Sequence, residues 1–377
     1  MAHRPPLDFT ITAEHKQLRS VVRRFAEQYS GDADVRRSMA SQIGYDRAVW
    51  DRMAGQIGLP GLVIPERYGG AGASFVELSI VLQEMGRRLF CAPFFATTVL
   101  ATHTLCYADD DAARHEYLPG IAAGTTVATL AWVEAAGAWR PGAAYQTGAV
   151  ADGPGWKLRG RKSFVLDGHV ADLILVIAST VDGDALFAVT GDAPGLARSA
   201  VPTLDQTRRL ATISFDDTPA RLIATRSADA VLDRVLDVAA VGLAAEQVGV
   251  AEFALETAVA YAQTRIQFDR VIASFQAVKH RCAQMLVEVE AARCAAGAGA
   301  YAVAEQRPDL PVAAAVAKTV CSQSCSRVTG DSIQLHGGIG FTWEHAAQLY
   351  FKRAKSSELL FGDPSQWREL LAQRLSW

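Results

Sequence analysis

Two stretches of this sequence are decisive for its fold, Ala262-Gln-Thr-Arg265-Ile-Gln-Phe268-Asp-Arg-Val-Ile-Ala-Ser274-Phe-Gln276 and Gln334-Leu-His-Gly337-Gly338. Each comes where a long helical pattern ends. The Arg265 guanidinium can grip a phosphate through two parallel hydrogen bonds, which a lysine cannot do. Gly337 and Gly338 carry no side chains, so a backbone N–H there can lie directly against an anion. The spacing alone also allows a plainer alternative, with Gly337 as a helix C-cap and Arg265 as a solvated helix end.

Length, composition and charge indicate an ordinary globular protein. The 377 residues are enough for two or three domains, or for one large domain. Hydrophobic residues make up 50% of the chain, as is usual for globular proteins. The net charge of −3 comes without a basic stripe, so nucleic acid is not expected as a partner. The N-terminus lacks an apolar signal core and no uninterrupted apolar run reaches about 18 residues, so we expect a cytoplasmic protein without a membrane span.

The cysteines and histidines form no recognisable redox or metal motif. The six Cys include no Cys-x-x-Cys pair. Cys321 and Cys325 lie four residues apart on an expected helix, and we interpret them as small core residues of a reduced protein. The eight His show no His-Glu-x-x-His or comparable ligand spacing, so no metal site is expected.

Hydrophobic periodicity divides the chain into three regions, 1–124, 125–226 and 227–377. The first region carries helical patterns, and the third is helical again. The middle region has short runs rich in Val, Ile, Thr and Phe between Gly- and Asp-rich turns, which is typical of strands. We therefore predict a mainly α protein with a small antiparallel β domain between two helical ones.

The individual elements follow from the same patterns. The helices predicted in the first region are 12–30 with Thr12 as N-cap, one carrying Trp50, Met53 and Ile57, 74–88 opened by Ser74, and 96–107. The clearest strands are 156–160, 173–177 and 213–215. The long helices of the third region are 229–264, 274–305 and 312–335. A last helix begins at Asp363-Pro364-Ser-Gln366, with Asp as N-cap, Pro at N1 and Gln at N3.

The chain resembles the acyl-CoA dehydrogenase family from about residue 10 to its end. The resemblance is carried by Arg-x-x-Phe at 265–268, Ser-Phe-Gln at 274–276 and Gln-x-x-Gly-Gly at 334–338, together with the segments 58–72 and 207–219. It implies an N-terminal helical domain, a middle antiparallel β domain and a C-terminal four-helix bundle, in that order. It also implies FAD as the cofactor and an acyl-CoA thioester as the substrate.

The resemblance further implies that one group of residues serves the FAD of a neighbouring chain. In the family, these Arg, Phe, Gln and Gly-Gly positions reach across a subunit interface. In this chain they are Arg265, Gln267, Phe268, Gln276, Gln334, Gly337 and Gly338. We call these residues the lent half-site.

The carboxylate base of the family is missing at both of its positions. Removal of two hydrogens from adjacent carbons of an acyl thioester needs a carboxylate that takes the α-proton and a flavin that takes hydride from the β-carbon. The resemblance places that base either directly before Gly362, where this chain has Phe361, or ten residues before Gly249, where it has Ala239. Neither side chain can accept a proton.

Glu246 is a weak candidate for a replacement base. It lies seven residues past Ala239, which is two helical turns or about 10 Å along the axis. A general base must reach hydrogen-bond distance of its proton, so a packing or ion-pair role is the favoured interpretation of Glu246 and of Glu252. Glu358 and Asp363, on either side of Phe361, are weaker candidates still.

The residues that the resemblance assigns to this chain's own flavin are also changed. In the family, one threonine hydroxyl from each of two β-domain loops bonds the flavin. The matching stretches here are Val133-Glu134-Ala-Ala-Gly137 and Phe164-Val165-Leu166, in which Val133 and Leu166 replace the threonines. Apolar side chains cannot donate a hydrogen bond to a flavin oxygen or nitrogen, so this half of the site is expected to bind flavin poorly.

This asymmetry resembles the non-catalytic (beta) subunits of actinobacterial heteromeric α2β2 acyl-CoA dehydrogenases, which oxidise CoA thioesters of steroid side chains. The main hypothesis is therefore a subunit that completes the FAD site of a homologous catalytic partner, with electron-transfer flavoprotein as the electron acceptor. Two alternatives stay open. One is a self-sufficient homo-oligomeric dehydrogenase with an unusual base such as Glu246, and the other is a flavin-free structural homologue.

Overall fold

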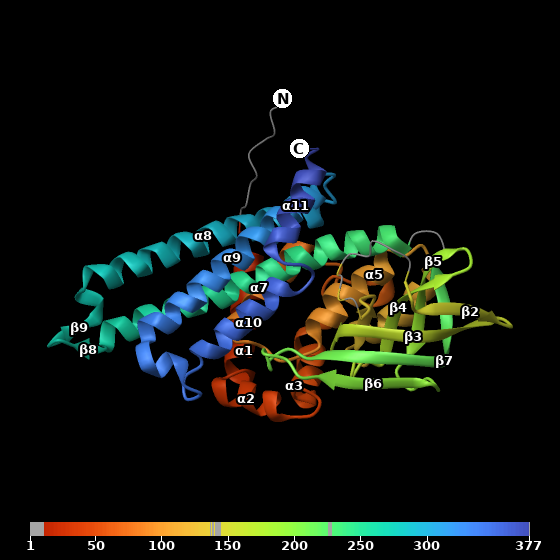
Figure 1. Ribbon diagram of the computed structural model, residues 1–377, viewed down its shortest axis with the longest axis horizontal. Helices are drawn as coiled ribbons and strands as arrows, with labels where there is room; N and C mark the ends of the chain where they lie inside the picture. Colours follow the sequence, from red (N-terminus) through yellow and green to blue (C-terminus); the bar gives the residue numbers. More distant parts are fainter. Residues whose placement is uncertain (1–10, 136, 138, 140–144, 225–227, 377) are drawn as a thin grey trace.

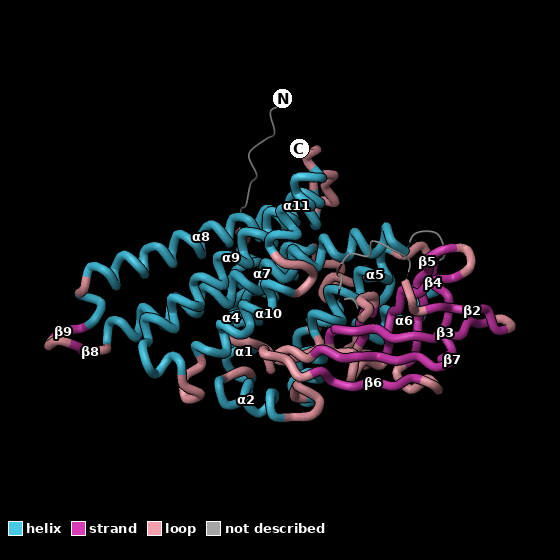
Figure 2. The backbone as a smooth tube through the Cα atoms, viewed as in Figure 1, coloured by secondary structure: helices cyan, strands magenta, loops and turns pink. Residues whose placement is uncertain are grey.

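The computed structural model describes residues 11–135, 137, 139, 145–224 and 228–376. Figure 1 shows a helical N-terminal part, a β sheet at one end of the molecule and a bundle of long helices that extends to the other end. The tube in Figure 2 shows the same division, with the main sheet gathered on one side. This order of helices, strands and helices confirms the predicted fold class.

The N-terminal helices begin where side chains can cap them. Thr12 accepts a hydrogen bond from the His15 N–H at the start of α1 (Ala13–Tyr29), and Ser74 forms a capping box with Glu77 at the start of α4 (Phe75–Arg87). Both starts confirm the predicted caps. The other helical segments are α2 (Asp32–Ala40), α3 (Arg47–Arg52), η1 (Met53–Ile57), η2 (Leu59–Gly61), η3 (Glu66–Tyr68), η4 (Phe95–Ala101), α5 (Thr102–Tyr107) and α6 (Asp111–Ala122).

Two predicted helices change type along their length. The helix predicted over 96–107 begins as the π-helix η4 and continues as α5. In the wider π-helical turn the Thr102 hydroxyl donates to the Thr97 carbonyl at 3.0 Å. The helix predicted around Trp50 likewise passes from α3 into the π-helix η1. Apolar spacing does not separate these helix types, because a single wider turn leaves the buried face nearly continuous.

The main sheet is mostly antiparallel, and its pairings form a closed ring. Its strands are β1 (Ala128–Ala131), β2 (Gly148–Asp152), β3 (Gly155–Leu166), β4 (Leu173–Thr180), β5 (Gly183–Thr190), β6 (Leu196–Val201) and β7 (Leu210–Ala224). The ring runs from β4 through β5, β7, β3 and β2 back to β4, and β6 pairs with β7. The domain also contains parallel pairing, since β1, and β2 at one residue pair, run parallel to β4. Residues 173–178 of β4 are buried without interruption, which explains their unbroken apolar sequence.

The C-terminal part is a bundle built around α7 (Ala228–Thr264). Its other helices are α8 (Gln276–Ala304), α9 (Leu310–His336), α10 (Ala347–Leu359) and α11 (Pro364–Arg374). The three long helices agree with the predicted ranges to within two residues, and Asp363 caps α11 as predicted. By length and composition α7 could cross a membrane, but 89% of its apolar window is buried inside the protein, because α7 packs against α4, α8 and α9.

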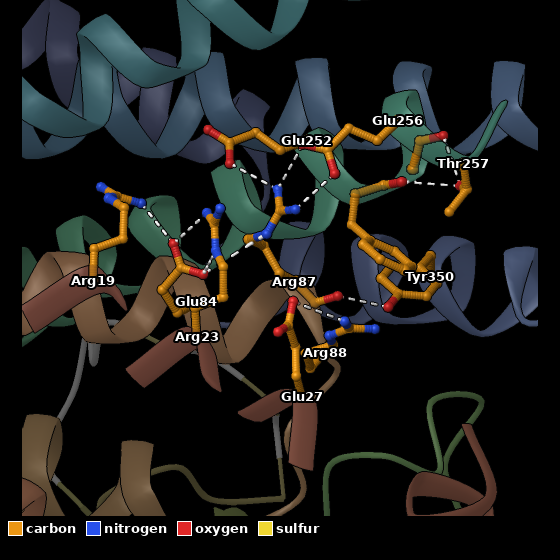
Figure 3. A network of polar contacts seen from close by, with 12 residues as sticks. Arg19, Arg23, Glu27, Glu84, Arg87, Arg88, Glu252, Glu256, Thr257 and Tyr350 are labelled. Atoms are coloured by element: carbon orange, nitrogen blue, oxygen red, sulfur yellow. Dashed lines mark hydrogen bonds and ion pairs between the residues drawn. The ribbon is translucent and has the colours of Figure 1, made fainter. Parts of the chain in front are cut away.

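An ion-pair network fastens the N-terminal helices to this bundle (Figure 3). Glu84 on α4 is 1% exposed and pairs with Arg19 and Arg23 of α1 at 2.8 Å each. Arg87, one turn further along α4, pairs with Glu252 of α7 at 3.2 Å. Because each buried carboxylate has a guanidinium partner, the charges are compensated and hold α1, α4 and α7 in one arrangement.

Candidate functional site

The lent half-site begins at the far end of α7. Arg265 follows the last residue of that helix, and Gln267 lies in β8 (Ile266–Gln267), which forms a hairpin with β9 (Arg270–Val271). Figure 1 shows this hairpin at the tip of the bundle, opposite to the main sheet. Arg265 is exposed, and its guanidinium has no hydrogen-bond or ion-pair partner within the described part of the chain. The guanidinium can therefore meet a group from outside this chain.

Phe268 occupies the turn of the hairpin in a strained conformation. Phe268 and Asp269 have φ values of 55° and 62°, which is the pair of left-handed residues that a type I′ turn needs. Bulky residues rarely adopt such values, yet the Phe268 side chain is 85% exposed. Strain that is not compensated by burial indicates a functional constraint rather than a packing one. Gln276, the first residue of α8, is exposed shortly after the turn.

The other members of the lent half-site lie where α9 ends. Gln334, Gly337 and Gly338 are all exposed, and the two glycines open the short helix η6 (Gly337–Phe341). Gly337 has a φ of 64° and caps α9 by donating its N–H to the Gln334 carbonyl, so the C-cap interpretation is correct for its conformation. A Cβ atom on either glycine would meet nothing within 4 Å. Both glycines therefore leave the backbone open to an external group.

Apolar side chains surround the lent half-site. The exposed ones are Ile266, Phe268, Ile339, Phe341 and Trp343 at the tip of the bundle, with Leu286 and Val287 on α8. Gathered apolar side chains of this kind mark a surface that another molecule covers. The structure thus brings the hairpin and the end of α9 to the same end of the bundle and presents both outward.

Phe361, at the first base position, lies in a buried cluster of aromatic rings. Its side chain is 2% exposed, and its ring centroid lies 6.0 Å from Phe95, 5.9 Å from Trp132 and 5.6 Å from Trp139. Phe164, which is 40% exposed, extends the cluster to the surface, with its centroid 6.3 Å from that of Trp139. We call these five residues the aromatic plug. They come from η4, the segment after β1, β3 and the turn before α11.

Polar contacts hold the plug in place. The Trp132 indole N–H donates to the Trp139 carbonyl at 2.8 Å. Glu134 accepts two backbone N–H bonds from 146–147 and pairs with the buried Lys162 at 2.8 Å. Burial by itself would raise the pKa of Glu134, but Lys162 and these N–H groups lower it to about 2. Glu134 is therefore charged at neutral pH and closes the loop that carries both indoles.

The remaining positions for this chain's own flavin and base are filled by apolar side chains. Val133 and Leu166 are each 2% exposed, and Ala239 is 0% exposed. All three belong to the same hydrophobic core as Phe361. At the positions where the resemblance puts the flavin-bonding hydroxyls and the base, the residues of this chain therefore do not fit those roles, because apolar side chains neither donate a hydrogen bond nor accept a proton.

Glu246 is held in a buried network of ion pairs. The side chain is 6% exposed, and it accepts hydrogen bonds from Arg208 at 2.5 Å and from Arg353 at 3.1 Å. Burial alone would raise the pKa of Glu246, but the two guanidiniums outweigh it and lower the pKa below the ordinary value. A carboxylate that two cations stabilise in its charged form is a poor proton acceptor. The geometry therefore supports the ion-pair role for Glu246.

The other weak base candidates also have structural partners. Glu252 pairs with Arg293 at 2.6 Å as well as with the guanidinium of α4. Glu358 pairs with Lys355 at 2.8 Å. Asp363 accepts the first backbone N–H groups of α11. None of these carboxylates lies unpaired beside Phe361.

Trp132, Trp139 and Lys162 belong to no motif of the sequence, and their place at the plug comes from the structure. A local signal existed for Lys162, because it lies four residues after the buried Leu158 in β3. Both side chains therefore point to the same, inward face of the strand. A lysine in that position needs a buried partner. No local pattern connects Trp139 with Phe361, since packing alone brings those segments together.

Comparisons with known proteins agree with this architecture. The acyl-CoA dehydrogenase N-terminal domain matches residues 12–125, and the acyl-CoA dehydrogenase C-terminal domain matches residues 229–376. Acyl-CoA dehydrogenase IpdE2 of Mycobacterium tuberculosis is 35% identical over 356 residues, covering 94% of each chain.

Two solved structures are similar over nearly the whole chain. The Tcur3481-Tcur3483 steroid ACAD variant has a TM-score of 0.87 and 32% identity, covering 97% of this chain and 99% of that one. The ChsE4-ChsE5 complex from Mycobacterium tuberculosis has a TM-score of 0.89 and 26% identity, covering 98% and 99%. With helices, sheet and bundle in the same order as its relatives, the chain belongs to the acyl-CoA dehydrogenase family.

Proposed function

We propose that this chain is the non-catalytic subunit of a heteromeric acyl-CoA dehydrogenase and completes the FAD site of a homologous catalytic chain. The reaction is the α,β-desaturation of an acyl-CoA thioester. A carboxylate takes the α-proton, and bound FAD supplies the acceptor for hydride from the β-carbon. We assign the carboxylate to the partner, because the matching positions here are Phe361 and Ala239.

The observation that carries this proposal is the opposite state of the two half-sites. The aromatic plug buries Phe361 where a chain with its own flavin would need open space. At the other end of the molecule, Arg265 is exposed without a partner within the described residues, and Phe268 is 85% exposed. A chain that used only its own flavin would need room around Phe361. A chain with no flavin role would have no need for an exposed Arg265 and Phe268.

The residues of the lent half-site have the chemistry for the phosphate end of a dinucleotide. Arg265 would bind a phosphate through two parallel N–H groups. The backbone at Gly338 would approach the same anion, since no side chain of this chain stands near it. Phe268 would cover the cofactor against water with its exposed ring.

The partner in this proposal is a homologous chain, in an α2β2 assembly. The apolar residues Leu286 and Val287 on α8 and the tip of the bundle supply a surface for it. Similarity to the ChsE4-ChsE5 complex and to a steroid ACAD supports a heteromeric enzyme and the CoA thioester of a steroid side chain as substrate. Electron-transfer flavoprotein as acceptor and a cytoplasmic location complete the proposal.

The test is the flavin content of the chain alone and of its complex. We expect the isolated chain to purify with little or no FAD, because the buried Val133, Leu166 and Phe361 side chains offer a flavin ring no hydrogen bond. Coexpression with the catalytic homologue should give a stable complex with stoichiometric FAD. Flavin absorbance after denaturation, set against protein concentration, measures both.

Stoichiometric FAD in the isolated chain would contradict this proposal and favour the self-sufficient homo-oligomer. A stable complex without flavin would favour the flavin-free structural homologue. Riboflavin-replete growth of both cultures is the control, since it ensures that low flavin content reflects the protein rather than the supply.

A separate prediction concerns Glu246 as the base of the self-sufficient alternative. Glu246→Gln should lower stability, because Arg208 and Arg353 lose their shared carboxylate, but turnover of the assembled enzyme should stay within a few-fold. Loss of a true general base costs about 10²-fold or more. Steady-state kinetics with flavin content and assembly verified would decide this, and a loss of the larger size would make this chain catalytic.

A further inference from the structure

The two segments of the lent half-site meet at three rings in mutual contact, with neighbouring ring planes tilted by 37° and 43°. Tyr261 on the last turn of α7 lies with its ring centroid 4.7 Å from that of His336, the last residue of α9. The His336 ring lies 4.3 Å from His345, which follows η6. We call Tyr261, His336 and His345 the ring stack. His336 is its central member and is 3% exposed.

Two members of the stack, Tyr261 and His336, are each tied directly to one segment of the lent half-site. The Tyr261 carbonyl accepts the Arg265 N–H at 2.8 Å, and the Arg265 carbonyl accepts the Ile272 N–H at 2.8 Å, which closes the hairpin. His336 immediately precedes Gly337. His336 therefore links the two segments: its backbone leads into Gly337 and Gly338, and its ring contacts Tyr261, whose carbonyl binds the Arg265 N–H.

Hydrogen bonds fix the orientation of both histidine rings. His336 Nδ1 lies 2.7 Å from the Ser332 carbonyl, and because a carbonyl only accepts, this nitrogen carries the hydrogen. His345 Nδ1 lies 3.1 Å from the Ala347 backbone N–H and accepts from it. The two rings therefore hold opposite tautomers, and each is anchored to the end of a helix.

The chain after His336 also folds back closely onto it. A Cβ atom at Gly340 would lie 2.8 Å from the His336 Cβ and 2.9 Å from the Ile333 carbonyl oxygen, so a glycine is needed there. Among the described residues, no hydrogen bond or ion pair joins 265–275 directly to 337–346. The ring stack is thus a direct side-chain contact between the ends of α7 and α9 that carry these two segments, beside the apolar packing of the same helices.

We propose that the ring stack, with His336 at its centre, positions the hairpin 265–275 and the loop 337–346 relative to each other, so that the lent half-site is presented as one unit. His336 is a positioning residue, since it is buried and does not reach the cofactor itself. This inference rests on the proposed function for its effect on FAD. Its structural part concerns the isolated chain and can be tested without flavin.

The first experiment measures backbone hydrogen exchange in the isolated chain. His336→Ala should speed exchange in both 265–275 and 337–346, and His336→Phe should restore it, because phenylalanine keeps the stacked ring and loses only the bond to Ser332. His103→Ala is the matched control, since His103 is also buried, contacts a tyrosine ring, Tyr107 at 5.8 Å, and bonds the carbonyl four residues before it, but lies on α5. Unchanged exchange in the two segments of His336→Ala would overturn the proposal.

The second experiment measures FAD affinity in the complex with the catalytic partner. His336→Ala should weaken FAD binding by about tenfold, with His336→Phe within a few-fold of the native chain and assembly intact in both. If Arg265→Ala weakens FAD binding but His336→Ala does not, the stack does not position the half-site and the inference is wrong. If neither variant changes FAD affinity, the proposed function fails, while the exchange result still decides whether the stack orders the two segments.

Discussion

Replacing Arg353 by methionine is expected to lower the free energy of unfolding by about 3–5 kcal/mol. The guanidinium is on α10, is 3% exposed, and donates to Asp205 at 2.9 Å, to Glu246 at 3.1 Å and to the Thr207 carbonyl at 2.8 Å. Burial alone would lower the pKa of Arg353, but Asp205 and Glu246 raise it, so the group stays charged. Methionine fills similar space but leaves the buried Asp205 without its guanidinium partner, while Glu246 keeps only Arg208. An uncompensated buried carboxylate is the costly outcome.

Urea unfolding of the isolated chain, followed by circular dichroism, measures this loss. Arg353→Lys should fall between the native chain and Arg353→Met, because it keeps the charge but loses the planar fork. Arg327→Met is the control, since its guanidinium is 63% exposed and pairs with Glu288 at 3.1 Å on the surface; it should cost about 1 kcal/mol or less. Equal, small losses for Arg353→Met and Arg327→Met would show that the buried network adds no more than a surface pair.

Replacing Arg265 by alanine is expected to weaken FAD binding to the assembled enzyme by about tenfold to a hundredfold, which corresponds to about 1.5–3 kcal/mol for a charged hydrogen-bonded pair. The partner chain is left unmutated, so any effect comes from this subunit. The FAD affinity of Arg265→Lys should lie between those of the native enzyme and of Arg265→Ala, since lysine restores the charge without the two parallel hydrogen bonds. Assembly should persist, because the surface offered to the partner consists mainly of apolar side chains at the tip of the bundle and on α8 rather than of Arg265.

FAD titration of the apo-complex, followed by flavin fluorescence, measures this affinity. Arg159→Ala is the control, because Arg159 is an exposed arginine of β3, 71% exposed and paired with Asp217, at the opposite end of the molecule. It removes the same charge without touching the tip of the bundle. Unchanged FAD affinity in Arg265→Ala would make Arg265 a solvated helix end and remove the main support for the lent half-site.

Local sequence rules predicted the long helices and the helix caps closely, whereas the predicted strands 156–160 and 213–215 cover only part of β3 and β7. Apolar spacing placed the three long helices to within two residues, and Thr12, Ser74 and Asp363 marked helix starts that the structure confirms. Such signals work because a cap or an amphipathic face depends on residues within a few positions of each other. They did not separate the π-helix η4 from α5, because both bury the same run of apolar residues.

The candidate site was predicted only in part. The sequence indicated that Phe361 and Ala239 cannot act as a base, since this follows from residue type alone. It did not indicate that Trp132 and Trp139 close around Phe361, because residues more than two hundred positions apart must first be packed together. The closure of this space is therefore a property of the tertiary structure rather than of either segment.

The role of Glu246 could not be predicted from the sequence either, because it depends on distant residues. On sequence alone it was a weak candidate for the base, at about 10 Å along the helix from the family position. Its partners Arg208 and Arg353 come from the segment before β7 and from α10. Glu246 forms buried ion pairs because the fold brings these two distant segments next to it. A carboxylate's chemistry depends on the charges around it, and those are set by long-range packing.

The sequence by itself determined the long helices and their caps, three strands of the middle region, the apolar residue types at 239 and 361, and the Arg265 and Gly337–Gly338 pattern. Only the tertiary structure decided which of these residues are exposed to solvent and which are buried. The physical reason is that backbone hydrogen bonding and apolar periodicity act between near neighbours, whereas burial and ion pairing depend on which distant segments the core brings into contact. For this chain, that packing enclosed Phe361 among aromatic rings and left Arg265 exposed at the tip of the bundle.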